Sequence, residues 1–195
     1  IASTSANISG AENPLSVKEI PKNIKKMVDI IISEGEVKGN PSAIWDTTKK
    51  LPCLLRGTIL FVCEGNSCRS PMAEYLLKNL IKKKESQIKV ESAGLNVSYP
   101  NSAHPNVWQV MEEKSINIEK FISKQLTSCI IKNSDLIFVM EKDQRDKILL
   151  YNPKIEDKII VLEIKDPYNG SLNLYRETRE KLSRQIEEVV LPRIC

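Results

Sequence analysis

A loop near the middle of the chain combines a nucleophile with groups that can bind an oxyanion. Cys63 follows a short apolar run, and a helical pattern begins near Pro71. A loop of this length can turn successive backbone N–H groups toward an anion, and the helix amino terminus adds partial positive charge. A cysteine in such a field is favoured as the thiolate, which is the nucleophilic form. We therefore predict that Cys63 attacks a bound oxyanion.

The residues between Cys63 and Pro71 supply the rest of this site. Arg69 carries a planar guanidinium that can bind two oxygens of a tetrahedral anion at once. Gly65 permits backbone conformations closed to other residues, and Asn66 tolerates a left-handed one while its amide ties the loop together. The predicted phosphate-binding residues are Glu64, Gly65, Asn66, Ser67, Cys68 and Ser70.

Asp166 is the candidate proton donor. Cleavage of a phosphate ester needs an acid within hydrogen-bond reach of the leaving group. Asp166 lies in a predicted loop between an apolar strand pattern and the last helical pattern, which brings it to the same sheet edge as Cys63. The expected reaction passes through a cysteinyl-phosphate that an Asp166-activated water hydrolyses, and it needs neither metal nor cofactor.

A parallel sheet is expected to position these groups. From residue 58, apolar runs at 58–62, 88–90, 136–140 and 159–162 alternate with helical patterns at 71–84, 107–114, 142–150 and 172–191. Strands alternating with helices indicate an α/β fold, here a small doubly wound four-stranded parallel sheet with flanking helices. Ligands of such folds bind at the carboxyl ends of the strands.

Composition and charge exclude several other classes. The 195 residues contain 41% hydrophobic residues and carry a net charge of +4, with both signs mixed. This charge is too mild to predict nucleic-acid binding. The sequence contains no apolar run of membrane-spanning length and no secretory leader pattern, so we expect a cytoplasmic protein without membrane contact. The chain starts at Ile1, which we interpret as a fragment boundary or a processing site. Oligomeric state is not indicated.

The loop resembles the signature of the low-molecular-weight protein tyrosine phosphatases, Cys-x-Gly-Asn-x-Cys-Arg-Ser-Pro, and the likeness extends over residues 58–195. It includes Ser92 in Ser-Ala-Gly, which supports the loop in that family, and Tyr168 in Asp-Pro-Tyr. The resemblance implies a metal-independent hydrolase acting on phosphorylated proteins. It also implies that Ser70 donates a hydrogen bond to the Cys63 sulfur.

The substrate branch stays open between three reactions. Phosphotyrosine hydrolysis is the expected activity, but Ser67 stands where bacterial relatives that resemble protein-arginine phosphatases carry threonine, and a small hydroxyl can bond a guanidinium. Arsenate reductases resemble this fold too, yet they need two further relay cysteines, and the middle region offers only Cys129. A phosphate-binding module without activity would not explain why Cys63, Arg69 and Asp166 occur together.

The other cysteines and the single histidine are given smaller roles. Five cysteines form an odd count, so a secreted disulfide framework is not expected. Cys68 either forms a reversible disulfide that protects Cys63 or fills space in the core. Cys129 and Cys195 have no evident role. His104 has no neighbours at ligand spacing, and we interpret it as a surface or loop residue.

Residues 1–57 differ in texture from residues 58–195, and we expect two domains with that boundary. The first is predicted as an incomplete α+β segment with a helix-like stretch at 20–32 and a strand around 42–45. It resembles the carboxyl-terminal third of YrdC-type threonylcarbamoyl-adenylate synthases. The resemblance implies that Ser5, Asn7 and Arg56 are a nucleotide-binding remnant. The family's other substrate-binding elements would precede Ile1, so we expect no synthase activity from this chain alone.

Overall fold

The structure, a computed structural model, describes residues 6, 14–33, 35–36, 42–82 and 86–195. The chain divides into two compact units, Ile1–Pro41 and Ser42–Cys195. Residues 42–57 thus pack with the second unit, while the domain boundary at residue 57, drawn from family resemblance, stays a prediction. The candidate nucleotide-binding residues Ser5 and Asn7 lie outside the described residues.

The first unit contains a shorter helix than its sequence predicts. Helix α1 spans only Lys22–Lys25, within the helix-like stretch at 20–32. The stretch ends in three consecutive isoleucines, whose β-branched side chains lower helix propensity. Ile30 and Ile32 are 78% and 90% exposed, so no packing surface compensates for that loss. The prediction of a long helix here was wrong.

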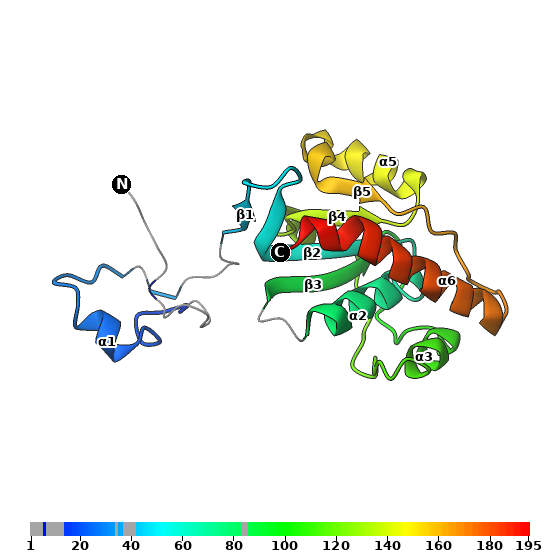
Figure 1. Ribbon diagram of the computed structural model, residues 1–195, viewed down its shortest axis with the longest axis horizontal. Coiled ribbons are helices and arrows are strands. Elements are labelled where there is room, and N and C mark those ends of the chain that lie inside the picture. The colour runs from blue at the N-terminus through cyan, green and yellow to red at the C-terminus, as the bar shows by residue number, and fades with distance from the viewer. Residues whose placement is uncertain (1–5, 7–13, 34, 37–41, 83–85) are drawn as a thin grey trace. The chain divides into compact units, whose positions relative to one another are not determined.

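The second unit is built on one mixed sheet (Figure 1). Four strands, in the order β3-β2-β4-β5, are parallel, which confirms the predicted sheet. A short strand, β1, adds antiparallel to the first residues of β2. The strands are β1 (Ile44–Asp46), β2 (Cys53–Cys63), β3 (Gln87–Gly94), β4 (Leu136–Val139) and β5 (Ile159–Val161).

Helices follow the strands close to the predicted positions. Thr127 caps a short helix that the sequence did not predict, and the last helix continues as a π-helical turn over 186–190 and a 3-10 turn over 191–193. A 3-10 segment at 153–158 precedes β5. The α-helices are α2 (Arg69–Ile81), α3 (Pro105–Glu112), α4 (Ser128–Lys132), α5 (Lys142–Tyr151) and α6 (Leu172–Gln185).

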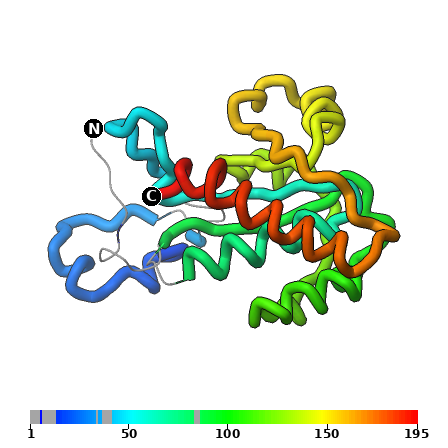
Figure 2. Tube along the Cα trace, turned by 45° about the vertical axis from the view of Figure 1, so that its right-hand side comes forward, coloured from blue at the N-terminus to red at the C-terminus, as the bar shows by residue number. Residues whose placement is uncertain are grey.

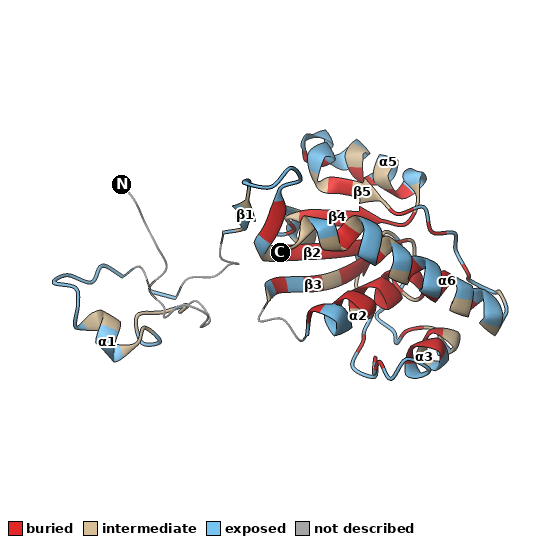
Figure 3. Ribbon diagram, in the orientation of Figure 1, coloured by how far each residue is buried: buried red, intermediate tan, exposed pale blue. Residues whose placement is uncertain are grey.

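The alternation of side chains along β2 divides the core into two layers. Ile59 and Phe61 pack with side chains of α2, α3 and α6, whereas Leu60 and Val62 pack with side chains of α4 and α5. This is the period of two that a strand covered on both faces requires. Residues 58–63 of β2 and all of β4 are accordingly buried, whereas β1 and the first residues of β3 are partly exposed, and the outer helix faces are exposed (Figure 3). Cys63 is thereby fixed at the carboxyl end of a rigid central strand.

The chain's last residue returns to the beginning of β2. In the ribbon and tube views the C-terminus lies beside the start of β2 (Figure 1 and Figure 2). The backbone N–H of Cys195 donates to the Leu54 carbonyl at 3.1 Å. Cys195 forms a disulfide with Cys53. The expectation that Cys195 has no role was therefore wrong, because a partner 142 residues away in sequence is not visible in local patterns. Among the described residues, no helix is long and apolar enough to cross a membrane.

Candidate active site

The loop predicted to bind phosphate, residues 63–71, is here called the phosphate loop. It connects β2 to α2, as the sequence predicts. Cys63 is the last residue of β2, and Arg69 is the first of α2. Both side chains are buried. The Cys63 sulfur lies 3.0 Å from the Ser70 hydroxyl oxygen, a hydrogen bond in which either atom could be the donor. Cys63 thus sits at the amino end of α2, where the helix dipole favours negative charge.

Asn66 holds the loop in its curved form. Its backbone is left-handed, with φ of 50°. Its amide nitrogen donates to the hydroxyls of Ser70 and Ser92, both at 2.9 Å, and its amide oxygen accepts from the Lys124 backbone N–H at 2.8 Å. Ser92 donates in turn to the Glu74 carboxylate at 2.5 Å. Ser92 therefore supports the loop through Asn66.

Glu74 was missed by the sequence reasoning. It lies on α2 among apolar residues that face the core, and its side chain is only 8% exposed. Burying a carboxylate costs free energy unless it is paired and hydrogen-bonded. Glu74 meets this need because it pairs with Lys78 and accepts from Ser92. An acidic residue within an otherwise apolar helix face is the signal that could have identified it.

Arg69 and Asp166 meet across 97 positions of sequence. The two ends of the Arg69 guanidinium form ion pairs with Asp166 and with Glu141, and one also donates to the Ile164 carbonyl at 3.1 Å. Burial lowers the pKa of Arg69, but the negative charges of Cys63 and the two carboxylates outweigh it and raise the pKa above its ordinary value. The Asp166 carboxylate also accepts from the Tyr168 backbone N–H at 3.0 Å.

Two features around Arg69 were not expected from the sequence. Glu141, which begins α5 through a capping box with Gln144, is a second carboxylate on the guanidinium. The Arg69 Nε atom is buried and has no hydrogen-bond partner within the described part of the chain. A buried donor without a partner is rare in proteins, and it marks a place where a ligand oxygen can bind.

A cavity of about 640 Å³ opens over the loop. Its lining includes Cys63, Ser67 and Arg69 as well as Asp166 and Tyr168. The other lining residues come from the loop itself and from the segment at 96–105, with Ser123: Glu64, Gly65, Cys68, Asn96, Val97, Ser98, Tyr99, Asn101, Ser102, Ala103, His104, Pro105 and Ser123. The candidate nucleophile, Arg69 and the candidate acid therefore line one cavity.

His104 contributes to the cavity wall. His104 is the N-cap residue that precedes α3, at the end of the loop predicted for it. Its backbone N–H donates to the Ser67 carbonyl at 2.9 Å. Its ring stacks on Tyr175 with centroids 5.2 Å apart and meets the edge of Tyr168 at 6.0 Å. The sequence placed His104 in a loop but did not indicate that it lines the site.

Cys68 lines the same cavity in a buried position. Its sulfur lies 3.5 Å from the Tyr175 hydroxyl and 3.6 Å from the Ser67 hydroxyl. Burial raises the pKa of the Cys68 thiol, and the hydrogen bonds to Tyr175 and Ser67 offset only part of this effect. Burial, with Cys68 next to it, also raises the pKa of Tyr175. Cys68 is therefore a buried thiol with a raised pKa beside the candidate nucleophile Cys63.

The remaining predicted site residues lie at the edge of the cavity or apart from it. Glu64 pairs with Lys147 at 3.2 Å. Tyr168 is 60% exposed at the rim. Arg56 donates to the Ser42 carbonyl at 3.1 Å and is not among the cavity residues. Cys129, the candidate arsenate relay cysteine, is exposed on α4 and does not line the cavity.

Comparisons with known proteins agree with this geometry. The family model for low molecular weight phosphotyrosine protein phosphatases matches residues 58–191, and the Sua5/YciO/YrdC model, described as telomere recombination, matches residues 1–58. A protein-arginine-phosphatase from Bacillus subtilis is 31% identical over 140 residues, which cover 67% of this chain and 93% of the relative.

Two solved structures share the fold of the second unit. The tyrosine phosphatase AmsI of Erwinia amylovora is 32% identical, with a TM-score of 0.65 over 71% of this chain and 94% of that one. The YwlE arginine phosphatase of Geobacillus stearothermophilus is 31% identical, with a TM-score of 0.64 over 70% of this chain and 92% of that one.

Proposed function

Because the chain belongs to the low molecular weight phosphotyrosine protein phosphatase family, we propose that it hydrolyses phosphoproteins with Cys63, Arg69 and Asp166. The observation that carries this proposal is that Cys63 and Arg69 line one cavity, while the buried Nε of Arg69 has no hydrogen-bond partner among the described residues. A phosphate oxygen would satisfy that donor, and the anion would then lie against the nucleophile.

In the first step, the Cys63 thiolate attacks phosphorus in line with the leaving oxygen. The sulfur–phosphorus bond forms as the ester phosphorus–oxygen bond breaks. The Ser70 hydroxyl, 3.0 Å from the sulfur, stabilises the thiolate before attack. Arg69 and the loop N–H groups bind the three equatorial oxygens, where negative charge is spread in the transition state.

Asp166 acts on the leaving oxygen and then on water. In the free protein the carboxylate is ion-paired with Arg69 at the edge of the phosphate position, and a bound phosphate would take its place on the guanidinium. In the first step, protonated Asp166 gives its proton to the leaving group; ionised afterwards, it takes a proton from the water that attacks cysteinyl-phosphate. Inorganic phosphate and the free Cys63 thiolate are the products.

Phosphotyrosine in proteins is the proposed substrate. Tyr99, His104 and Tyr168 line the cavity above the loop. Aromatic rings in such a wall can pack against a phenyl ring in edge-to-face or offset contacts. Such contacts would bind a phenol ester and leave its phosphate against Cys63.

Phosphoarginine in proteins is the second candidate, and Ser67 favours it. Ser67 lines the cavity, and its hydroxyl can accept a hydrogen bond from a guanidinium. A bulky aliphatic side chain at this position would remove that acceptor and fill its space. The relative named protein-arginine-phosphatase supports this alternative.

Hydrolysis of phosphotyrosine and phosphoarginine peptides, measured side by side with a chelator present, tests the proposal. We expect phosphate release that Cys63→Ser abolishes and Cys129→Ser leaves intact, with the ratio of kcat/KM values identifying the substrate. Release from neither peptide would contradict a protein phosphatase. Release that persists in Cys63→Ser would contradict the assigned nucleophile.

A cytoplasmic location is proposed because Cys63 must stay reduced to react; in that reducing compartment Cys53 and Cys195 would be held as two thiols. For the amino-terminal segment, we propose that residues 1–57 are part of a YrdC-like domain in which Ser5, Asn7 and Arg56 belonged to a nucleotide site. The match of that family's model to residues 1–58 supports the assignment. If ATP binds this chain, Arg56→Ala should weaken the binding, and ATP binding that Arg56→Ala leaves unchanged would contradict the assignment.

A further inference from the structure

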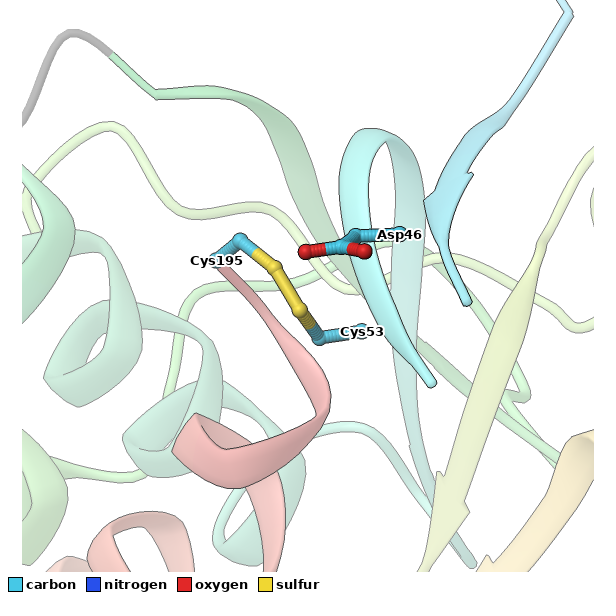
Figure 4. Close-up of side chains that lie close together, drawn as sticks. All are labelled: Asp46, Cys53 and Cys195. Carbon is cyan, nitrogen blue, oxygen red and sulfur yellow. A yellow bond between two sulfur atoms is a disulfide. The ribbon is translucent and has the colours of Figure 1, made fainter. Parts of the chain in front are cut away.

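Three potential metal ligands meet at the end of the sheet that lies away from the phosphate loop. The sulfur atoms of Cys53 and Cys195 and a carboxylate oxygen of Asp46 all lie within 4.8 Å of one another (Figure 4). In the described part of the chain, this is the one group of three or more such ligands. Cys53 is 1% exposed.

Backbone pairing brings these residues together. Asp46 and Cys53 are cross-strand partners in the β1–β2 pair. Cys195 is held beside them because its N–H donates to the Leu54 carbonyl and its neighbour Ile194 forms a bridge with Leu54. The cluster therefore does not depend on chance contacts of flexible side chains.

The ligand types suit zinc. Two thiolates and a carboxylate are among the groups that bind Zn²⁺ tetrahedrally, with water able to take the fourth position. Zinc–sulfur bonds of about 2.3 Å at a tetrahedral angle would separate the sulfurs by about 3.8 Å. The Cys53 and Cys195 Cα atoms are 5.7 Å apart, so this separation needs only side-chain rotation.

Neighbouring residues orient the Asp46 ligand and balance the charge of the cluster. One Asp46 oxygen accepts from the backbone N–H and the hydroxyl of Thr48, at 2.9 and 2.6 Å, which orients the carboxylate and leaves its other oxygen available. The Lys49 ammonium lies 3.4 Å from the Cys195 sulfur. Its positive charge would balance the net negative charge of two thiolates, one carboxylate and Zn²⁺.

We propose that Asp46, Cys53 and Cys195 bind one zinc ion whenever the Cys53–Cys195 disulfide is reduced. Reduction by a phosphine adds two electrons and two protons to the disulfide, and the phosphine takes up one oxygen from water. Zinc then displaces the two thiol protons. Cys53 precedes Cys63 by ten positions along β2, about 33 Å, so a bound zinc ion would not touch the phosphate loop but would connect β1, β2 and the segment after α6.

Cobalt binding to the full chain tests this proposal. Cys63→Ser and Cys68→Ser are introduced first, so that thiols at the phosphate loop do not bind metal. After phosphine reduction, we expect one Co²⁺ per chain, the visible bands of tetrahedral thiolate-bound cobalt, and displacement by one equivalent of Zn²⁺. Without reduction, these bands should be absent.

Single substitutions in the same background identify the ligands. Cys195→Ser should remove the thiolate bands, and Asp46→Asn should weaken cobalt affinity at least about 10-fold, whereas the control Cys129→Ser should bind normally. Both ligand variants change partly exposed residues, and an unchanged circular dichroism spectrum shows that each is folded. Normal cobalt bands in Cys195→Ser, or equal bands before reduction, would overturn the proposal.

Discussion

Replacement of Asn66 tests whether a buried amide shapes the phosphate loop. Asn66 is fully buried and adopts a left-handed backbone. Three hydrogen bonds depend on its side chain, to Ser70, Ser92 and the Lys124 backbone. Asn66→Gly removes these bonds but tolerates the backbone conformation, whereas Asn66→Ala removes them and also opposes the conformation.

The two variants should differ by a calculable amount. Each lost hydrogen bond costs about 0.5–1.5 kcal/mol, so Asn66→Gly should lower the free energy of unfolding by about 3 kcal/mol. The left-handed conformation costs a residue with a Cβ about 1–2 kcal/mol more, so Asn66→Ala should lose about 4–5 kcal/mol. Both variants should also lose kcat, because the loop N–H groups no longer converge on one point.

Urea denaturation followed by tryptophan fluorescence measures the stability of the unit that carries the loop, since Trp45 and Trp108 both lie within Ser42–Cys195. Asn106→Ala, which changes an Asn outside the network, is the matched control. A neutral surface substitution changes the free energy of unfolding by no more than about 0.5 kcal/mol. If Asn66→Gly changes it by that little, the Asn66 hydrogen bonds do not support the loop as described.

Three further outcomes are expected. Asp166→Asn should lower kcat/KM, which reports the phosphoryl-transfer step, by about 10²–10⁴ for phenyl phosphate and much less for p-nitrophenyl phosphate, whose leaving group needs no proton; equal losses in kcat/KM would contradict an acid role. Because burial raises the pKa of Cys68, iodoacetamide at neutral pH should leave Cys68 unmodified in Cys63→Ser, and its reaction should begin only above the ordinary thiol pKa of about 8.5; rapid modification at pH 7, detected by peptide mass spectrometry, would contradict this. Ser67→Ile should shift the ratio of kcat/KM values about 10–200-fold toward phosphotyrosine if the Ser67 hydroxyl binds a guanidinium; an unchanged ratio would exclude that contact, with Ser98→Ala as the control.

The sequence predicts those parts of the molecule that local pattern determines. Cys63, Arg69 and Pro71 occupy the strand end and helix start that their order implies, and the alternation of Ile59 to Val62 reflects a strand buried on both faces. The parallel sheet follows because each strand is separated from the next by helical crossover residues.

Contacts between distant segments could not be read in the same way. The pairing of Glu141 with Arg69 joins residues 72 positions apart, and nothing near Glu141 distinguishes it from any residue that caps a helix. The Cys53–Cys195 pair depends on how the end of the chain returns to β2. His104 became part of the cavity wall through its ring contact with Tyr175, which only the packing of α3 against α6 creates.

Detection of the covalent intermediate is the most direct test of Cys63 as the nucleophile. When the Asp166→Asn variant is mixed with p-nitrophenyl phosphate, attack by Cys63 should proceed because this leaving group needs no proton. Hydrolysis of cysteinyl-phosphate should be slowed because the base is missing, so the intermediate should accumulate. Rapid quenching followed by peptide mass spectrometry should locate one phosphoryl group on Cys63. Phosphate release with the phosphoryl group on a different residue, or with no phosphorylated peptide at any time, would contradict the mechanism.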